Sequence, residues 1–171
     1  MTTETSAAKK PVVRVERKYE GVPEDLWYLW TTKEGFESWW GPEGFRVEVH
    51  KLDLRVGGEL IYDMIAVDPE QIEWLRKSNM PVSHGTRGKF VEVVPLQRLG
   101  ISHMIDFIPG LKPYENQMFV EFLPEGSSVR MVVTVEEHTT QEWTRMAVQG
   151  FESQLTRVPA ALAARRAARS K

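Results

Sequence analysis

Hydrophobic and polar residues alternate along several short segments of the chain, and this alternation predicts β-strands. In the first of them, residues 12–19, one face is more polar than the other. The other alternating segments are residues 45–54, 60–65, 85–94, 99–108, 116–123 and 129–136. Gly or Pro stands between most of these segments, as turns require. The pattern therefore predicts about six or seven strands.

Two short helices are predicted directly after the first strand. Pro23 stands where the first helix begins, a position that tolerates its missing N–H and suits its fixed φ. Thr31 or Thr32 is expected to cap the second helix, which carries Trp39 and Trp40 inward. Burying one tryptophan removes roughly 150–250 Å² from water. The adjacent pair therefore indicates either a helix end anchored in the core or a wall of a ligand cavity.

One long helix is predicted near the C-terminus, because apolar residues recur there at steps of three and four. Thr139 or Thr140 is expected to cap it, and Pro159 is expected to bend or end it. Its inward stripe consists of Met146, Gly150, Phe151, Leu155 and Val158. Residues 160–171 are rich in Ala and Arg, have little to bury and are interpreted as a helical tail.

This order of elements predicts an α+β domain with a curved antiparallel sheet, one face of which must be covered. The final helix is the element long enough to cover it, and the two early helices would plug one end. A chain of 171 residues suffices for one domain with a real core. We expect a disordered lead-in at residues 1–11, one domain at residues 12–158 and a tail at residues 159–171.

Two segments between the strands carry further predictions. Gly57 and Gly58 are typical of a tight hairpin, here between strands that end near Leu54 and begin near Glu59. Residues 68–84 break the strand pattern and predict a loop with one or two helical turns.

The segment 68–84 also motivates the prediction of a homodimer. Its apolar residues Trp74, Leu75 and Met80 need cover, which a second copy of the chain would provide. Sedimentation at high protein concentration tests this prediction, and a purely monomeric result contradicts it.

Composition excludes several classes of function. A net charge of −2 gives no bias toward nucleic acid or an anionic surface. The chain has no Cys, which excludes disulfides, thiolate catalysis and thiolate metal sites. No apolar run approaches the roughly 18 residues that span a bilayer, and residues 1–10 lack the apolar core of a signal peptide. We therefore expect a cytoplasmic protein without membrane insertion.

Signals for catalysis and metal binding are weak. The histidines His50, His84, His103 and His138 have no short ligand spacing, and no hydrolase signature is present, so we expect no metal, no cofactor and no catalytic residue. His103 and Asp106 point to opposite faces of a strand and do not form a dyad. His103 lies on an apolar face, either as a core histidine with a backbone partner or as a polar handle for a ligand.

An ordered set of motifs between residues 12 and 158 resembles the activator of Hsp-90 ATPase homologue family, within the START-like helix-grip superfamily. The motifs are Pro23-x-x-Leu26-Trp27-x-x-Trp30-Thr31, Trp39-Trp40-Gly41-Pro42, Leu54-Arg55-Val56-Gly57-Gly58-Glu59, Gly88-x-Phe90-x-Glu92-Val93, Pro95-x-x-Arg98-Leu99 and Gly150-Phe151-x-x-x-Leu155. The family usually has Trp at the position of Phe151 and a shorter loop in place of residues 68–84.

The resemblance implies a long C-terminal helix gripped by a curved sheet, with an apolar cavity between them. The function that follows is a binding module for a small apolar or amphipathic molecule, a site type that is mostly apolar with a few polar handles. The residues expected around the cavity are Trp39, Trp40, Phe45, Tyr62, Met64, Phe90, His103, Met118, Met131, Met146, Gly150 and Leu155.

Two alternatives remain open. The first is an enzyme of the cyclase or hydratase kind, for which His103, Tyr62 and Asp63 are the acid or base candidates, although Asp63 lies on the opposite strand face from Tyr62. The second is a domain that acts on a chaperone through its surface, as the family name suggests. An exposed apolar patch outside the cavity would favour the second.

Overall fold

The fold was obtained as a computed structural model, which describes residues 10–106, 108 and 110–170. Residues 1–9, which make up most of the predicted lead-in, lie outside the described residues. The order of elements is the predicted α+β order, with two short helices after the first strand and helices again at the C-terminus.

Seven strands form one antiparallel sheet in the order β1-β7-β6-β5-β4-β3-β2. Their bounds are β1 (Val12–Glu20), β2 (Phe45–Leu52), β3 (Glu59–Ala66), β4 (Ser83–Val94), β5 (Arg98–Ile105), β6 (Tyr114–Glu125) and β7 (Ser128–Glu136). Sequential strands pair from β2 to β7, and β1 adds to β7 at the far edge. The predicted sheet is confirmed, with β5 ending at Ile105 rather than at residue 108.

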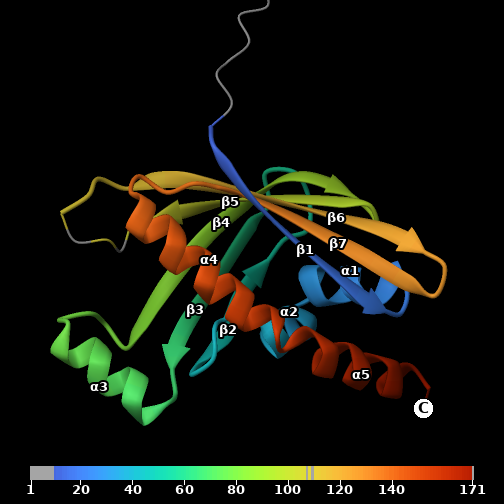
Figure 1. Cartoon of the computed structure of the whole chain (residues 1–171), viewed down its shortest axis with the longest axis horizontal. Coiled ribbons are helices and arrows are strands. Elements are labelled where there is room, and N and C mark those ends of the chain that lie inside the picture. The colour runs from blue at the N-terminus through green and yellow to red at the C-terminus, as the bar shows by residue number, and fades with distance from the viewer. Residues whose placement is uncertain (1–9, 107, 109, 171) are drawn as a thin grey trace, which may run out of the picture.

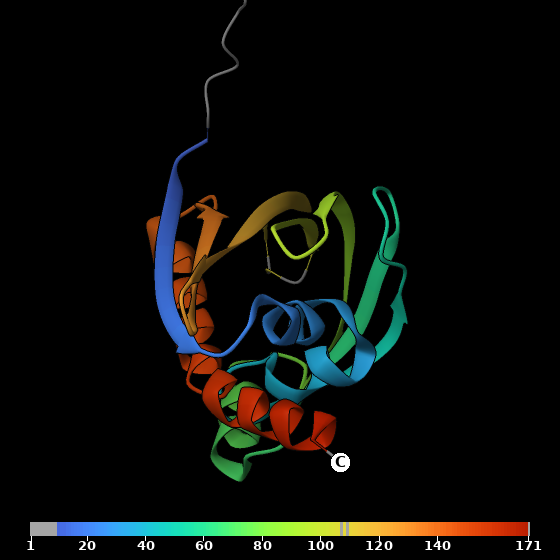
Figure 2. The same cartoon turned by 90° about the vertical axis from the view of Figure 1, so that its right-hand side faces the viewer.

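The sheet is curled, and five helices accompany it in the part of the chain that the structure describes. The helices are α1 (Pro23–Thr31), α2 (Lys33–Trp39), α3 (Pro69–Lys77), α4 (Gln141–Leu155) and α5 (Val158–Arg169). Figure 1 shows α4 running diagonally across the sheet, and Figure 2 shows α1 and α2 within the curl at one end. This is the predicted helix-grip arrangement.

The helices begin and end where the sequence places their signals. The hydroxyl of Thr32 accepts a hydrogen bond from Gly35 N at 3.0 Å and caps α2. Thr140 caps α4 by accepting from Trp143 N at 3.1 Å. Pro159 lies in the first turn of α5, so α4 and α5 are separate helices, as the predicted bend requires.

The two early helices bring large aromatic side chains into the core. Trp30, Phe36 and Trp39 are all fully buried. The indole Nε1 of Trp39 donates to Leu29 O at 2.9 Å, and that of Trp30 lies 3.3 Å from Met131 Sδ. Because each buried indole N–H has a partner, these rings add apolar contact without leaving a polar group unpaired.

The segment 68–84 is more ordered than predicted, because most of its first half forms the helix α3. The side chain of Asp68 caps α3 by accepting from Gln71 N at 3.1 Å. Leu75 is buried within this chain, whereas Trp74 is 51% exposed. One of the apolar residues that motivated the homodimer is therefore covered without a second copy, and the homodimer stays a prediction.

The C-terminal segment also has more to bury than predicted. The expectation that residues 160–171 bury little is wrong for Ala161 and Leu162, which lie in the core. Arg169 Nη2 donates to the buried carboxylate of Asp25 in α1 at 2.6 Å. The helix α5 therefore packs against α1 through both apolar contact and this ion pair.

Gly57 and Gly58 turn the chain between β2 and β3, as predicted, but for two different reasons. Gly57 has a φ of +84°, a conformation that favours glycine. Gly58 has no such φ, and a Cβ there would collide with the backbone oxygen of Asp53.

We expect Gly58→Val to destabilise the protein more than Gly57→Ala. Gly57→Ala forces a positive φ on a residue with a Cβ, which costs about 1–2 kcal/mol, but the added Cβ meets no neighbouring atom. Gly58→Val must displace the backbone at Asp53. The free energy of unfolding in urea measures both. An unchanged stability for Gly58→Val would contradict the close approach seen in the structure.

Candidate functional site

A cavity of about 360 Å³ lies between the concave face of the sheet and α4. Its walls are mostly apolar side chains that come from α3, α4, all seven strands and the loops after α2 and α3. The sheet contributes Tyr62, Ile105, Met118 and Val135 among others. The alternation of strand side chains explains this arrangement, because every second residue of each strand faces the helix.

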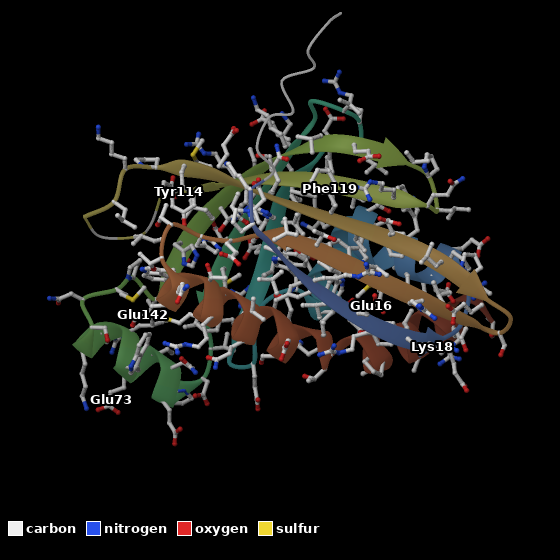
Figure 3. All side chains as sticks on the ribbon, turned by 45° about the horizontal axis from the view of Figure 1, so that its top comes forward. Glu16, Lys18, Glu73, Tyr114, Phe119 and Glu142 are labelled. Atoms are coloured by element: carbon white, nitrogen blue, oxygen red, sulfur yellow. The ribbon has the colours of Figure 1, made fainter. Side chains whose placement is uncertain are left out.

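The cavity reaches the surface between α3 and α4. Trp74 of α3 is 51% exposed and Met146 of α4 is 41% exposed, and both also line the cavity. Figure 3 shows the two helices at this place, with Glu73 marking α3 and Glu142 marking the first turn of α4. The segment 68–84 thus forms one side of the entrance.

The structure brings most of the predicted cavity residues together. Those that line the cavity are Trp40, Phe45, Tyr62, Met64, His103, Met118, Met146 and Gly150. The other four, Trp39, Phe90, Met131 and Leu155, are not lining residues and pack in the core. Trp39 turns toward α1, and Met131 packs under Trp30, which explains why these two lie away from the open space.

Three side chains form a hydrogen-bonded cluster in the wall of the cavity. Trp40 Nε1 donates to the hydroxyl oxygen of Tyr62 at 3.1 Å, and the same oxygen lies 3.3 Å from Nε2 of His103. The rings of Trp40 and His103 are nearly parallel, with centroids 6.2 Å apart. All three residues are buried. The cluster places polar atoms in a mostly apolar wall, to which Thr86, Asn116 and Gln154 also contribute polar side chains.

The contact between Tyr62 and His103 was not predicted from the sequence. These residues stand on β3 and β5, which are separated by β4. The inward position of β4 beside His103 is Gly88, which has no side chain to fill the space between them. A glycine at an inward-facing position of a central strand is the signal that would have indicated a contact across it.

Burial keeps both members of this pair uncharged at neutral pH. It raises the pKa of the Tyr62 phenol, although hydrogen bonds from Trp40 and Thr86 act in the opposite direction. Burial lowers the pKa of His103 to about 4. The pair therefore acts as a neutral donor and acceptor rather than as an ion pair.

We expect the stability of the protein to fall as the pH drops from 6.5 to about 4. The unfolded chain binds a proton at His103 near the ordinary pKa of 6.5, whereas the folded chain binds it only near 4. Protonation of the unfolded chain in this window lowers the free energy of unfolding by about 3 kcal/mol in total. His84 and His138 act in the same direction, since burial lowers the pKa of each.

Urea unfolding of the wild type and of His103→Gln at pH 7 and pH 5 measures this effect. The variant should lose part of the pH dependence, with His84 and His138 accounting for the remainder. An identical slope in both proteins would show that His103 is not the group that titrates.

The Trp-Trp-Gly-Pro motif is held in place by the end of α4 and the start of α5. Gly41 N donates to Oε1 of Gln154 at 3.0 Å. Arg157 Nη1 donates to the backbone oxygens of Trp40 and Gly41, each at 3.2 Å. The loop therefore has its backbone groups paired by helix side chains, which fixes the ring of Trp40 as a wall of the cavity.

The remaining candidates lie elsewhere or have structural partners. Asp63 faces outward, where its carboxylate lies 2.8 Å from Nε2 of the exposed His50. At the cavity, Nδ1 of His138 lies 2.5 Å from the hydroxyl of Tyr114. In the part of the chain that the structure describes, no group of three or more His, Cys, Asp or Glu side chains is placed to hold a metal ion.

The curled sheet, the long helix and the cavity between them define a helix-grip domain. The sequence model described as activator of Hsp90 ATPase homolog 1-like protein matches residues 21–163, so the chain belongs to this family. No protein among those with curated descriptions matches the sequence. Within the described residues, no helix is long and apolar enough to cross a membrane.

Solved structures of bacterial proteins share the fold. A protein from Chromobacterium violaceum has a TM-score of 0.72 at 21% identity, over 88% of this chain and 96% of its own. The AHSA1 protein from Silicibacter pomeroyi has a TM-score of 0.70 at 22% identity, over 91% and 99%. An AHSA1-like protein from Aeromonas hydrophila has a TM-score of 0.62 at 18% identity, over 87% and 94%. At these identities the likeness concerns the fold alone.

Proposed function

We propose that this protein binds a small apolar or amphipathic molecule in the cavity between the sheet and α4. The observation that carries the proposal is a cavity of about 360 Å³ that opens between α3 and α4 and is lined mostly by apolar side chains. Such a cavity with a few polar groups is the usual form of a small-molecule site. Met64, Met118 and Met146 in its walls are flexible side chains that adapt to differently shaped ligands.

The geometry favours binding over the cyclase or hydratase alternative. A general acid or base works best when its pKa lies near the working pH. Burial moves the pKa of Tyr62 upward and that of His103 downward, away from neutrality in both cases. Asp63, the third candidate, faces outward and contacts His50. These observations support a role for Tyr62 and His103 in holding a ligand rather than in proton transfer.

Titration with the neutral fluorescent probe N-phenyl-1-naphthylamine tests the proposal. We expect saturable binding with an increase in fluorescence and a higher melting temperature, because a ligand that binds the folded state stabilises it. Native mass spectrometry of freshly purified protein would add the mass of a co-purified ligand. If the probe neither binds nor stabilises, the binding proposal fails, and a domain that acts through its surface becomes the better account.

A further inference from the structure

The charge of the cavity wall restricts what the cavity can hold. Among the lining residues that the structure describes, none is Lys, Arg, Asp or Glu. The imidazole of His103 is neutral at pH 7 for the reason given above. A charged ligand group placed here would lose its hydration without gaining an opposite charge, which is costly. The inner part of the ligand is therefore uncharged.

The direction of the hydrogen bonds in the wall identifies which groups remain available. The indole N–H of Trp40 is a donor only, so the oxygen of Tyr62 accepts from it. Between Tyr62 and His103, the phenol is the stronger donor and the imidazole nitrogen is the stronger acceptor. The phenol proton of Tyr62 therefore points to Nε2 of His103, across the 3.3 Å that separates them.

This direction fixes the tautomer of His103. A neutral imidazole carries one proton, and when Nε2 accepts, that proton is on Nδ1. Within the described residues, Tyr62 is the hydrogen-bond partner found for the ring of His103. His103 is 8% exposed and lines the cavity, so an acceptor for its Nδ1–H group would come from a molecule in the cavity. A ligand oxygen in the cavity would accept this hydrogen bond in place of water.

We propose that the ligand is an uncharged molecule with an apolar body and a carbonyl oxygen. This inference rests on the proposed function. The oxygen accepts the Nδ1–H of His103, and the apolar body occupies the space toward the entrance between α3 and α4. Tyr62 and Trp40 are positioning residues in this arrangement, because they orient the imidazole and its proton rather than reach the ligand oxygen themselves.

Nitrogen-15 NMR of the histidine rings tests the tautomer in the wild-type protein without a ligand. We expect the ring of His103 to carry its proton on Nδ1, with Nε2 unprotonated. Tyr62→Phe removes the donor to Nε2 and should mix the two tautomers. A wild-type ring protonated on Nε2 would present an acceptor to the cavity and would overturn the proposal.

A matched set of probes tests the ligand class. Benzophenone, diphenylmethane and diphenylacetate share two phenyl rings on one carbon, and they differ in carrying a carbonyl oxygen, no oxygen or a carboxylate. We expect benzophenone to bind the wild type about 3- to 10-fold more tightly than diphenylmethane, the range of one neutral hydrogen bond. Diphenylacetate should bind most weakly. In His103→Phe, benzophenone and diphenylmethane should bind equally.

The outcomes separate this proposal from the proposed function. If diphenylmethane binds the wild type as well as benzophenone does, or if diphenylacetate binds best, the ligand class is wrong while the cavity still binds apolar molecules. If none of the probes binds, the proposed function itself fails. Because the tautomer and the probe series are both measured on the wild type, a His103→Phe variant that fails to fold leaves these tests intact.

Discussion

Gly150→Leu is expected to abolish the binding of apolar probes while leaving the protein folded. Gly150 lies in α4 and lines the cavity, and a Cβ built there meets no heavy atom within 4 Å. The new side chain therefore enters open space rather than a packed core. Replacing a helical glycine also removes about 1 kcal/mol of unfavourable helix propensity, so the free energy of unfolding should stay level or rise.

Gln149→Leu is the matched control for this variant. Gln149 is the preceding residue of α4 and is exposed, so the same side chain is added to the same helix outside the cavity. The control should bind the probe as the wild type does. At a hundredfold excess of probe over its Kd, the wild type and the control should gain about 2.7 kcal/mol of stability, and Gly150→Leu should gain none.

A Gly150→Leu variant that unfolds would mean that α4 packs directly on the sheet at this position. Normal probe binding by a folded variant would place the probe elsewhere. Either result would remove the main support for a binding site between the sheet and α4.

The fold was predictable because its determinants are local. Alternation in the strands, Pro23 at the first helix and the Thr caps before α2 and α4 act within a few residues of the elements they define. The prediction was weaker where contacts between residues far apart in the sequence decide which side chains are buried. The Ala/Arg-rich sequence of α5 offers few large apolar residues, and Ala161 and Leu162 are buried because α5 packs against α1 and α2.

The cavity was predictable only in part for a related reason. Alternation gives the face on which a strand residue lies, but not whether open space or another side chain stands in front of it. Phe90 and Met131 lie on inward faces like Tyr62 and Met118, yet both pack in the core rather than line the cavity, Met131 against Trp30 of α1. The missing information is where the early helices end and the open space begins.

The two adjacent tryptophans illustrate this boundary, because they have different roles although their chemistry is the same. Trp39 is fully buried and is not among the lining residues. Trp40 has one face on the core ring of Phe36, at 4.5 Å between centroids, and also lines the cavity. The sequence left open whether either ring would anchor the helix or form a cavity wall. In the structure Trp39 anchors the helix in the core, and Trp40 forms part of the cavity wall.

Trp39→Ala is therefore expected to lower the free energy of unfolding by about 3–5 kcal/mol, the usual cost of emptying a buried aromatic site.

The conservative pair Trp39→Phe and Trp40→Phe separates the two roles at lower cost. Trp39→Phe loses the hydrogen bond to Leu29 O and should reduce stability while leaving the Kd for N-phenyl-1-naphthylamine unchanged. Trp40→Phe loses the donor to Tyr62 and changes the cavity wall, so it should change that Kd. Urea unfolding and probe titration on each variant give both quantities. If Trp39→Phe altered the Kd and Trp40→Phe did not, the assignment of the two rings would be reversed, and the cavity would have to extend toward α1 rather than toward Tyr62 and His103.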